Sequence, residues 1–404
     1  MQTAADRAPA VHLTLDGLSG PVAFEAGTEA VADGVREVLV GWPESGGIAP
    51  GEPCLVVRRQ GKAILVTRCR DGWHSKHRSV VSAICTAVVE IVADHVDGQE
   101  GLGSLHAAAA EFAGRLLVFP ALHRAGKSTL MTALSAGGRR IFADDLLPVD
   151  LQTLEGVATG CLPRLRLPLP ESMPPGLPAF VAAHTVSSDG YYAYVAGGPR
   201  VAHGERAPIG AVVLLDRQSE PCAARLDPAA PDEALLGLLM QDARDAFPAG
   251  QTLDRYHTLV SKSALYRLTY FDLGEAIDCL DTAFSSWPDP IAAADPPTSV
   301  PDHRAATASA PDPAEGRYRR SPTATLKVLG TSAFLVNPDR NDVHHLNAMG
   351  LGLWNLLERP MSEEAIVEIF LGAFPDQPES AVRDDVAEAL DRLTAVGLVE
   401  DLQL

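Results

Sequence analysis

The chain has 404 residues, 46% of them hydrophobic, and a formal net charge of −19. This length exceeds what one hydrophobic core usually supports, so we expect two or three domains. The acidic balance argues against nonspecific binding to nucleic acid, so any phosphate site has to be local.

The first hundred residues alternate strand-like and helical patterns without a recognisable catalytic cluster. The pattern predicts strands at Val11–Leu15, Leu55–Arg58 and Ala63–Thr67, and helices near Glu29–Val40 and at Val80–Val96. We therefore expect residues 1–100 to form an α+β region that serves as a scaffold.

A glycine-lysine-serine string follows an apolar run, Leu116–Phe119, and opens a helix-like run, Ser128–Ala136. Backbone N–H groups at a helix start face an anion, Lys127 can reach outer phosphates, and the Ser128 hydroxyl can bind Mg²⁺. The string predicts a nucleotide site made of Ala121, Leu122, His123, Arg124, Ala125, Gly126, Lys127, Ser128 and Thr129. The alternative is an ordinary helix capped by serine.

Two adjacent aspartates, Asp144 and Asp145, end the next short apolar run after a helix stop at Gly137-Gly138. If the two strands are adjacent and parallel, these carboxylates lie beside the phosphate loop. One could then hold Mg²⁺ and the other accept a hydroxyl proton, and the sequence leaves open which is the base. The alternative is a solvated turn.

With His106 upstream, this set resembles the kinase domain of the HPr kinase/phosphorylase family over residues 101–285. The resemblance implies an α/β phosphate-loop fold related to ATP-dependent phosphoenolpyruvate carboxykinase, which uses ATP and Mg²⁺ to phosphorylate a protein serine. By position, Lys127 and Ser128 would bind phosphates and Mg²⁺, and Asp144 would be the base. Asp145 would support the metal or the acceptor, and His106 would line the site.

The chain departs from that family in two places. Ala121, His123 and Arg124 stand at three signature positions of the family's G-x-S-G-x-G-K-[ST] loop. The family's glutamate- and glycine-rich signature is replaced by Cys161–Pro168, in which alternation puts Arg164 and Arg166 on one strand face. They suit phosphate or acceptor contacts, or are simply exposed arginines on an edge strand.

Beyond the aspartates, the sheet is expected to continue. Strand-like runs occur at Tyr191–Val195 and Ala211–Leu215, and helical ones at Asp232–Met240 and Phe271–Ala283. From residue 286 to 322 the composition changes to Pro, Ala, Asp, Ser and Thr, which predicts a flexible linker.

Residues 323–404 carry the pattern of a small winged-helix unit of three strands and three helices. The strands are expected at Thr325–Leu329, Ala333–Val336 and Val343–Leu346, and the helices at Ala348–Glu358, Ser362–Phe374 and Glu379–Val396. Asn347, Trp354, Met361–Glu364 and Gly397–Val399, in that order, make residues 318–404 resemble the PqqD family.

The PqqD resemblance implies a recognition element for precursor peptides of ribosomally made natural products. A leader peptide would add as a strand to the sheet and lie against the last helix. The implied contacts are Val343, His344, His345, Leu346, Arg383 and Val386. The alternative is a DNA-binding winged helix, but Asp384, Asp385 and Glu388 on the last helix would repel a phosphate backbone.

Together the patterns predict an ATP-dependent kinase that phosphorylates a Ser or Thr of a precursor peptide held by its leader. The alternatives are a catalytically silent chaperone that delivers the peptide to another enzyme, and a regulatory kinase of the HPr type. Six cysteines without paired metal-ligand spacing indicate free thiols. With no signal-like or membrane-spanning run, we expect a cytoplasmic protein without membrane or nucleic-acid partners, and the sequence leaves room for a homo-oligomer.

Overall fold

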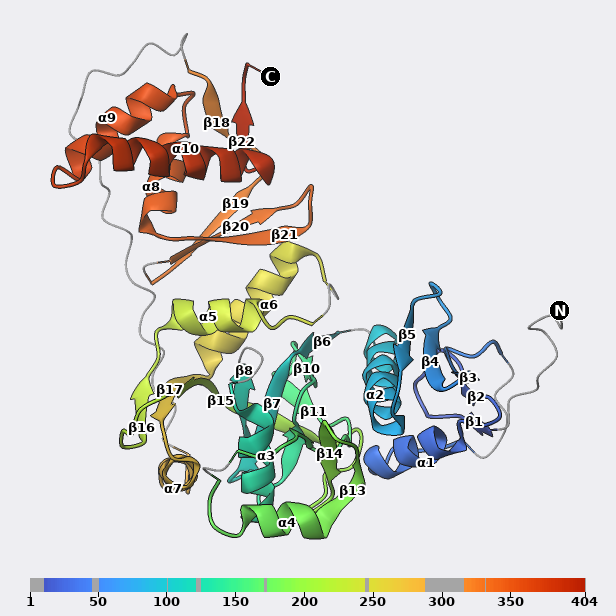
Figure 1. The fold of residues 1–404 in the computed structure, drawn as a ribbon. Coiled ribbons are helices and arrows are strands. Elements are labelled where there is room, and N and C mark those ends of the chain that lie inside the picture. The colour runs from blue at the N-terminus through green and yellow to red at the C-terminus, as the bar shows by residue number, and fades with distance from the viewer. Residues whose placement is uncertain are drawn as a thin grey trace. The chain divides into compact units, whose positions relative to one another are not determined.

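The computed structural model describes residues 11–45, 51–99, 101–120, 125–170, 173–243, 247–287, 316–330 and 332–403. Two compact units make up the chain (Figure 1), the first from Met1–Ala246 with Arg255–Ile291 and the second from Phe247–Asp254 with Ala292–Leu404. Each unit is described by itself below.

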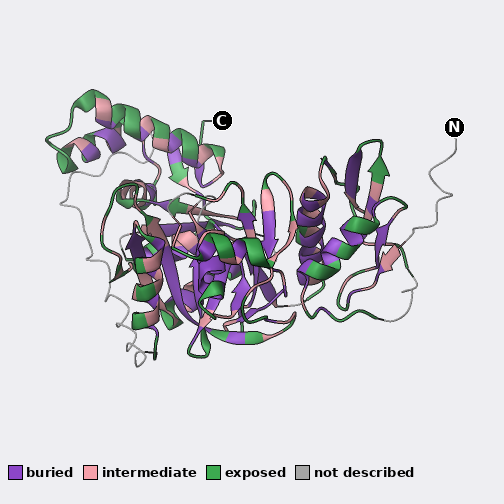
Figure 2. Cartoon of the chain, turned by 60° about the horizontal axis from the view of Figure 1, so that its bottom comes forward, coloured by how far each residue is buried: buried purple, intermediate pink, exposed green. Residues whose placement is uncertain are grey.

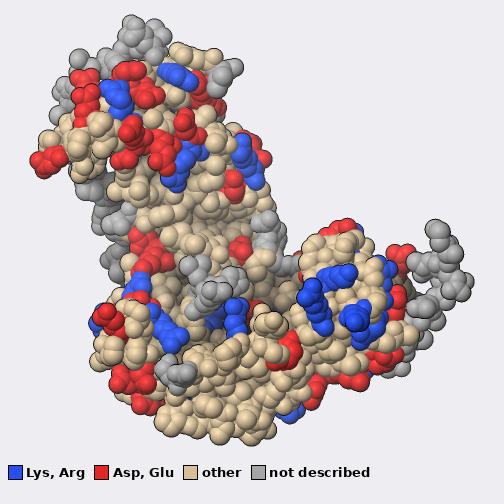
Figure 3. Space-filling view, in the orientation of Figure 1, with Lys and Arg blue, Asp and Glu red and all other residues tan. Residues whose placement is uncertain are grey.

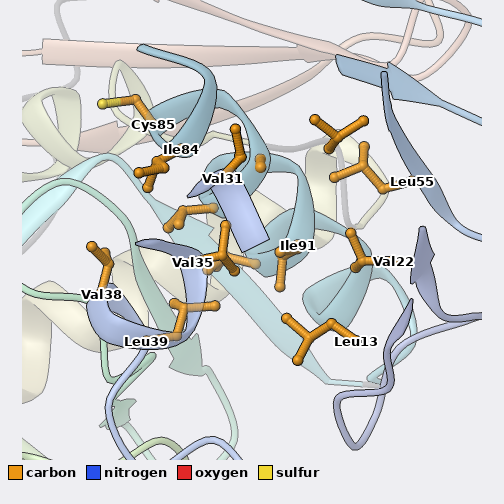
Figure 4. Packing of buried hydrophobic residues seen from close by; sticks show 14 of the residues in the cluster. Leu13, Val22, Val31, Val35, Val38, Leu39, Leu55, Ile84, Cys85 and Ile91 are labelled. Carbon is orange, nitrogen blue, oxygen red and sulfur yellow. The ribbon is translucent and has the colours of Figure 1, made fainter. Parts of the chain in front are cut away.

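The first unit opens with a five-stranded sheet in the order β1-β2-β3-β4-β5 and two helices. The strands are β1 (Val11–Leu13), β2 (Val22–Phe24), β3 (Leu55–Gln60), β4 (Ala63–Arg68) and β5 (His74–His77), and the helices are α1 (Glu29–Val38) and α2 (Val80–Asp97). Side chains of both helices and the sheet share one core (Figure 4), and Cys85 lies at the margin of this cluster.

A nine-stranded mixed sheet forms the centre of the first unit, in the order β6-β10-β11-β15-β8-β7-β9, with β17 and β16 continuing from β15. Its strands are β6 (Leu102–Leu105), β7 (Ala107–Phe112), β8 (Arg115–Pro120), β9 (Ile141–Ala143), β10 (Leu147–Asp150), β11 (Glu155–Val157), β15 (Arg206–Arg217), β16 (Arg225–Pro228) and β17 (Ala264–Tyr270). Figure 2 shows its central strands as buried. Such continuous apolar runs are typical of strands covered on both faces.

Helices cover both faces of this sheet. They are α3 (Lys127–Ala136), α4 (Leu177–His184), α5 (Pro231–Leu239) and α7 (Leu273–Ala283). Helix α6 (Ala249–Lys262) is divided between the two units, since its residues up to Asp254 belong to the second. Residues of α3 and α7 share a core with Val213, whereas α5 packs on the next residue of β15, Leu214. A separate three-stranded sheet has the strand order β12 (Arg164–Arg166), β14 (Tyr192–Val195) and β13 (Thr185–Ser188). In the sequence, β12 lies between α3 and α4, and the other two strands follow α4.

Strand direction decides which residues meet at one edge of the central sheet. β15 runs parallel to β8 and β17 runs parallel to β15, while β7 is antiparallel to both β8 and β9. The expectation that β8 and β9 are adjacent was therefore wrong, because β7 pairs between them. Both still end at the same edge, since each is antiparallel to the same strand.

The second unit contains the predicted three strands and three helices. These are β19 (Thr325–Leu329), β20 (Ser332–Asn337), β21 (Asp342–Leu346), α8 (Ala348–Leu356), α9 (Glu363–Ala373) and α10 (Glu379–Ala395). Asn347 caps α8 and Ser362 caps α9, each accepting a backbone N–H with its side chain. The helices enclose a core around Trp354 beneath β20.

The predicted linker, residues 286–322, was too long at both ends. Trp287 donates a hydrogen bond to the Phe112 carbonyl of the central sheet. At the other end, β18 (Tyr318–Arg320) pairs with β22 (Val399–Asp401), and Tyr318 is buried. A three-residue strand with two arginines has no apolar periodicity to reveal it. The rest of the linker prediction, residues 288–315, lies outside the described residues.

The described residues also show how charged side chains are distributed and that the cysteines are unpaired. Acidic side chains are spread over both units, and basic ones gather over β3 to β5 (Figure 3). All six cysteines are free, with Cys85 buried and Cys69 exposed. Within the described ranges, the structure contains no helix with the length and apolar character needed to cross a bilayer.

Candidate functional site

Helix α3 begins directly after a glycine in a left-handed conformation. Gly126 is the N-cap with φ of 92°, and no side chain among the described residues caps the helix. A Cβ at this position would lie 3.1 Å from Tyr270 Oη, and its φ would strain any other residue. The first N–H groups of α3 are thus arranged as in anion-binding helix starts.

The sheet edge gathers the catalytic candidates around this helix start. His106 precedes β7, Lys127 follows β8, and the two aspartates follow β9. Lys127 is 7% exposed, and its Nζ lies 3.5 Å from the His106 carbonyl oxygen. Burial lowers the pKa of Lys127, while the negative charges of Asp145 and Asp144 act in the opposite direction.

Asp144 is a buried carboxylate, 6% exposed. Its Oδ2 accepts a hydrogen bond from the Arg164 backbone N–H at 2.9 Å, whereas Oδ1 has no hydrogen-bond partner among the described residues. Burial raises the pKa of Asp144 to about 6, with the Arg164 N–H and the Ser128 hydroxyl opposing that rise and the Asp145 charge adding to it. Such a carboxyl is ionised at neutral pH and still basic enough to take a proton.

Asp145 is more exposed and is held by two partners. Its Oδ1 lies 3.2 Å from His106 Nε2, and its Oδ2 accepts from the Arg164 guanidinium at 3.2 Å. That guanidinium also lies over the Tyr192 ring, 5.1 Å from its centre. The two aspartates therefore occupy different environments, and Asp144 is the better placed to act as a base.

Two further residues stand beside the helix start. Arg217 ends β15 and Tyr270 ends β17, the two strands parallel to β8. Together with Gly126 and Thr129 they line a small recess. No motif in the sequence marks these two residues, although the strand predicted at Ala211–Leu215 already placed Arg217 near a strand end.

The other loop and strand predictions have mixed outcomes. Ala121, Leu122, His123 and Arg124 lie outside the described residues. Arg164 lies in the site, whereas Arg166 is exposed with its guanidinium 6.0 Å from the Tyr192 ring centre. No three His, Cys, Asp or Glu side chains of the described residues gather to hold a metal. Mg²⁺ fits Ser128 and Asp145 only if phosphate oxygens complete its coordination.

A second site lies in the C-terminal domain, between the edge strand β21 and helix α10. It is a groove with a volume of about 420 Å³. Its lining residues are His345, Leu346, Asn347, Met349, Gly350, Asp385, Glu388, Ala389, Arg392 and Leu393. β21 pairs with β20 on one side, so within the described residues its other side offers backbone groups to a further strand.

Only part of the predicted peptide contacts face this groove. His345 and Leu346 line it, whereas Val343 and His344 do not. Arg383 lies on α10 and pairs with Glu379 at 3.1 Å. Val386 was wrongly chosen, since it is 0% exposed and belongs to the core. Helical spacing instead turns Asp385, Glu388 and Ala389 toward the groove.

Comparisons with known proteins concern the C-terminal domain. Residues 332–399 match the family described as Coenzyme PQQ synthesis protein D (PqqD). The C-terminal domain is therefore PqqD-like, as its sequence predicted. A solved structure titled "TbiB1 in Complex with the TbiA(beta) Leader Peptide" is 22% identical over 20% of this chain and 94% of that chain, with a TM-score of 0.19. No curated protein matches the chain.

Proposed function

We propose that this protein is an ATP-dependent kinase that phosphorylates a Ser or Thr of a precursor peptide captured through its leader. The capture step is supported by the PqqD-like domain and by the groove along β21, whose apolar floor includes Leu346 and Leu393. An extended leader would add backbone hydrogen bonds to the strand and place side chains on α10.

The kinase step is supported by one observation above all, the buried Asp144 carboxylate beside a glycine-capped helix start that carries Lys127 and Ser128. Phosphoryl transfer needs positioning and charge neutralisation more than covalent participation by the protein. Lys127, the α3 N–H groups and Arg217 provide positive charge or donors at one edge of the sheet.

In the proposed step, Asp144 accepts the proton of the acceptor hydroxyl. The acceptor oxygen forms a bond to the γ-phosphorus, the bond to the bridging oxygen breaks, and ADP leaves with that electron pair. Asp145 lies between His106 Nε2 and the Arg164 guanidinium, 3.2 Å from each. Ser128 and Asp145 would hold Mg²⁺, which when bound neutralises phosphate charge.

The test is mass spectrometry of a leader-bearing precursor peptide, encoded near this gene, after incubation with full-length protein, ATP and Mg²⁺. We expect a gain of one phosphate that Lys127→Ala and Asp144→Asn reduce by on the order of a hundredfold or more. Asp227→Asn, an exposed carboxylate on β16 outside the site, is the matched control. A peptide that binds but gains no phosphate would leave only the capture function.

A further inference from the structure

The first hundred residues do more than support the fold, because α2 forms one wall of a pocket at the two aspartates. Cys85, Val88, Val89 and Val92 line it from α2. Their spacing puts them on one helical stripe. Val89 is 43% exposed although apolar. Leu146, Leu162 and Tyr194 complete apolar walls of a cavity with a volume of about 40 Å³.

The polar end of this pocket is the proposed catalytic site itself. Asp144, Asp145 and Arg164 line the pocket together with the α2 stripe. Asp144 brings to it a carboxylate whose Oδ1 is without a hydrogen-bond partner among the described residues. A buried acceptor without a donor favours a ligand that supplies a hydroxyl at that point.

The two ends of the pocket differ from each other in chemistry. Tyr194 donates to Cys85 Sγ at 3.4 Å, and Arg164 is already paired with Asp145. Burial raises the pKa of the Cys161 thiol to about 12, so this thiol adds no negative charge to the pocket at neutral pH. The α2 end therefore presents apolar surface, and a charged side chain there would lose its hydration without gaining a partner.

We propose that this pocket is a specificity site for the peptide, and that it receives the small aliphatic side chain next to the acceptor Ser or Thr. The inference rests on the proposed kinase function and adds the acceptor sequence to it. A cavity needs about 10–15 Å³ of such volume to admit a single water. The volume of about 40 Å³ exceeds this threshold and suits a side chain the size of alanine or valine. An aromatic ring is too large.

The test uses full-length protein and leader-bearing peptides that differ only in the residue before or after the acceptor, which is Gly, Ala, Val, Phe or Asp. On one side of the acceptor we expect kcat/KM for Val to exceed that for Gly by about tenfold, the range that a few methylene contacts provide. Phe and Asp should fall below Gly.

Two variants of the exposed Val89 assign the preference to the pocket. Val89→Phe narrows the pocket and should bring the Val peptide down to the Gly peptide, so that the ratio of their kcat/KM values falls from about ten to about one. Val89→Ala widens it and should improve the Phe peptide. A loss shared equally by all peptides would overturn the specificity role.

The outcomes separate this inference from the proposed function. Equal phosphorylation of all peptides by the wild-type protein would overturn the pocket's role and leave the kinase standing. Absence of phosphate gain on every peptide would overturn both. Preference for Asp would also overturn the inference, because it would show that Arg164, rather than the apolar α2 stripe, sets the preference for the residue next to the acceptor.

Discussion

Asp144 keeps an ionisable group where the fold would be more stable without a charge. Burial raises its pKa to about 6 from the usual 3.8. Because the folded-state pKa lies above the unfolded one, the contribution of Asp144 to folding stability is most favourable below about pH 4, where the carboxyl is protonated in both states. That contribution is lost as the pH rises through about 6. Instability stored in this way is typical of catalytic residues.

Asp144→Asn should therefore stabilise the protein while it removes the base of the proposed phosphoryl transfer. The amide can still accept the Arg164 N–H and carries no charge, so we expect a gain on the order of 1–3 kcal/mol at pH 8 that shrinks toward zero near pH 4. Urea unfolding of both proteins across this pH range measures it. Destabilisation at pH 8 would contradict the burial argument.

At the scale of elements, the order of the motifs along the chain predicted the site better than the expected pairing of β8 with β9 did. The string Gly126-Lys127-Ser128 between an apolar run and a helical run was enough to place α3. The aspartates were correctly expected near it, although β7 separates β8 from β9. His106 lies at the same edge because it directly precedes that intervening antiparallel strand.

The role of α2 could not be predicted from its sequence. A helix that is apolar almost all round indicates burial on two sides but does not say what the second side meets. Only the tertiary fold brings Val88 and Val89 to Asp144. The prediction that Val386 contacts the peptide was wrong for a related reason, since one step along α10 separates a core position from a groove position.

A histidine cluster joins the N-terminal layer to the central sheet region. Trp42, which follows α1, stacks on His203 with ring centres 3.8 Å apart, and His95 of α2 contacts the same ring at 4.8 Å. Burial, together with the neighbouring His95, lowers the pKa of His203 to about 4. The neutral ring is therefore part of this packing.

Falling pH should destabilise the packing around His203 before the remainder of the first unit unfolds. Since the folded pKa of His203 lies below its unfolded value of 6.5, its contribution is complete above pH 6.5 and is lost as the pH falls toward 4. His203→Phe should reduce the stability loss between pH 7 and pH 5 by on the order of 1 kcal/mol, allowing for partial exposure. Calorimetry at several pH values checks this, with exposed His184→Gln as the control. An unchanged pH slope in His203→Phe would contradict it.

For the molecule as a whole, the proposed function divides the selection of the substrate between two sites. A groove that binds the leader raises the local concentration of the acceptor, so the catalytic pocket needs to read only a residue or two. This division predicts that damage to the groove changes how much peptide is needed and leaves the chemical step intact.

Ala389→Trp, which fills the groove from α10, tests the division in the full-length protein. We expect KM for the leader-bearing peptide to rise about tenfold or more with kcat nearly unchanged, because only binding shared by ground and transition states is removed. A short leaderless acceptor peptide should keep its low kcat/KM. Arg383→Ala on the same helix, outside the groove lining, is the matched control and should leave both values unchanged. If Ala389→Trp slowed the leaderless peptide as well, the groove would be acting on the chemistry rather than on capture.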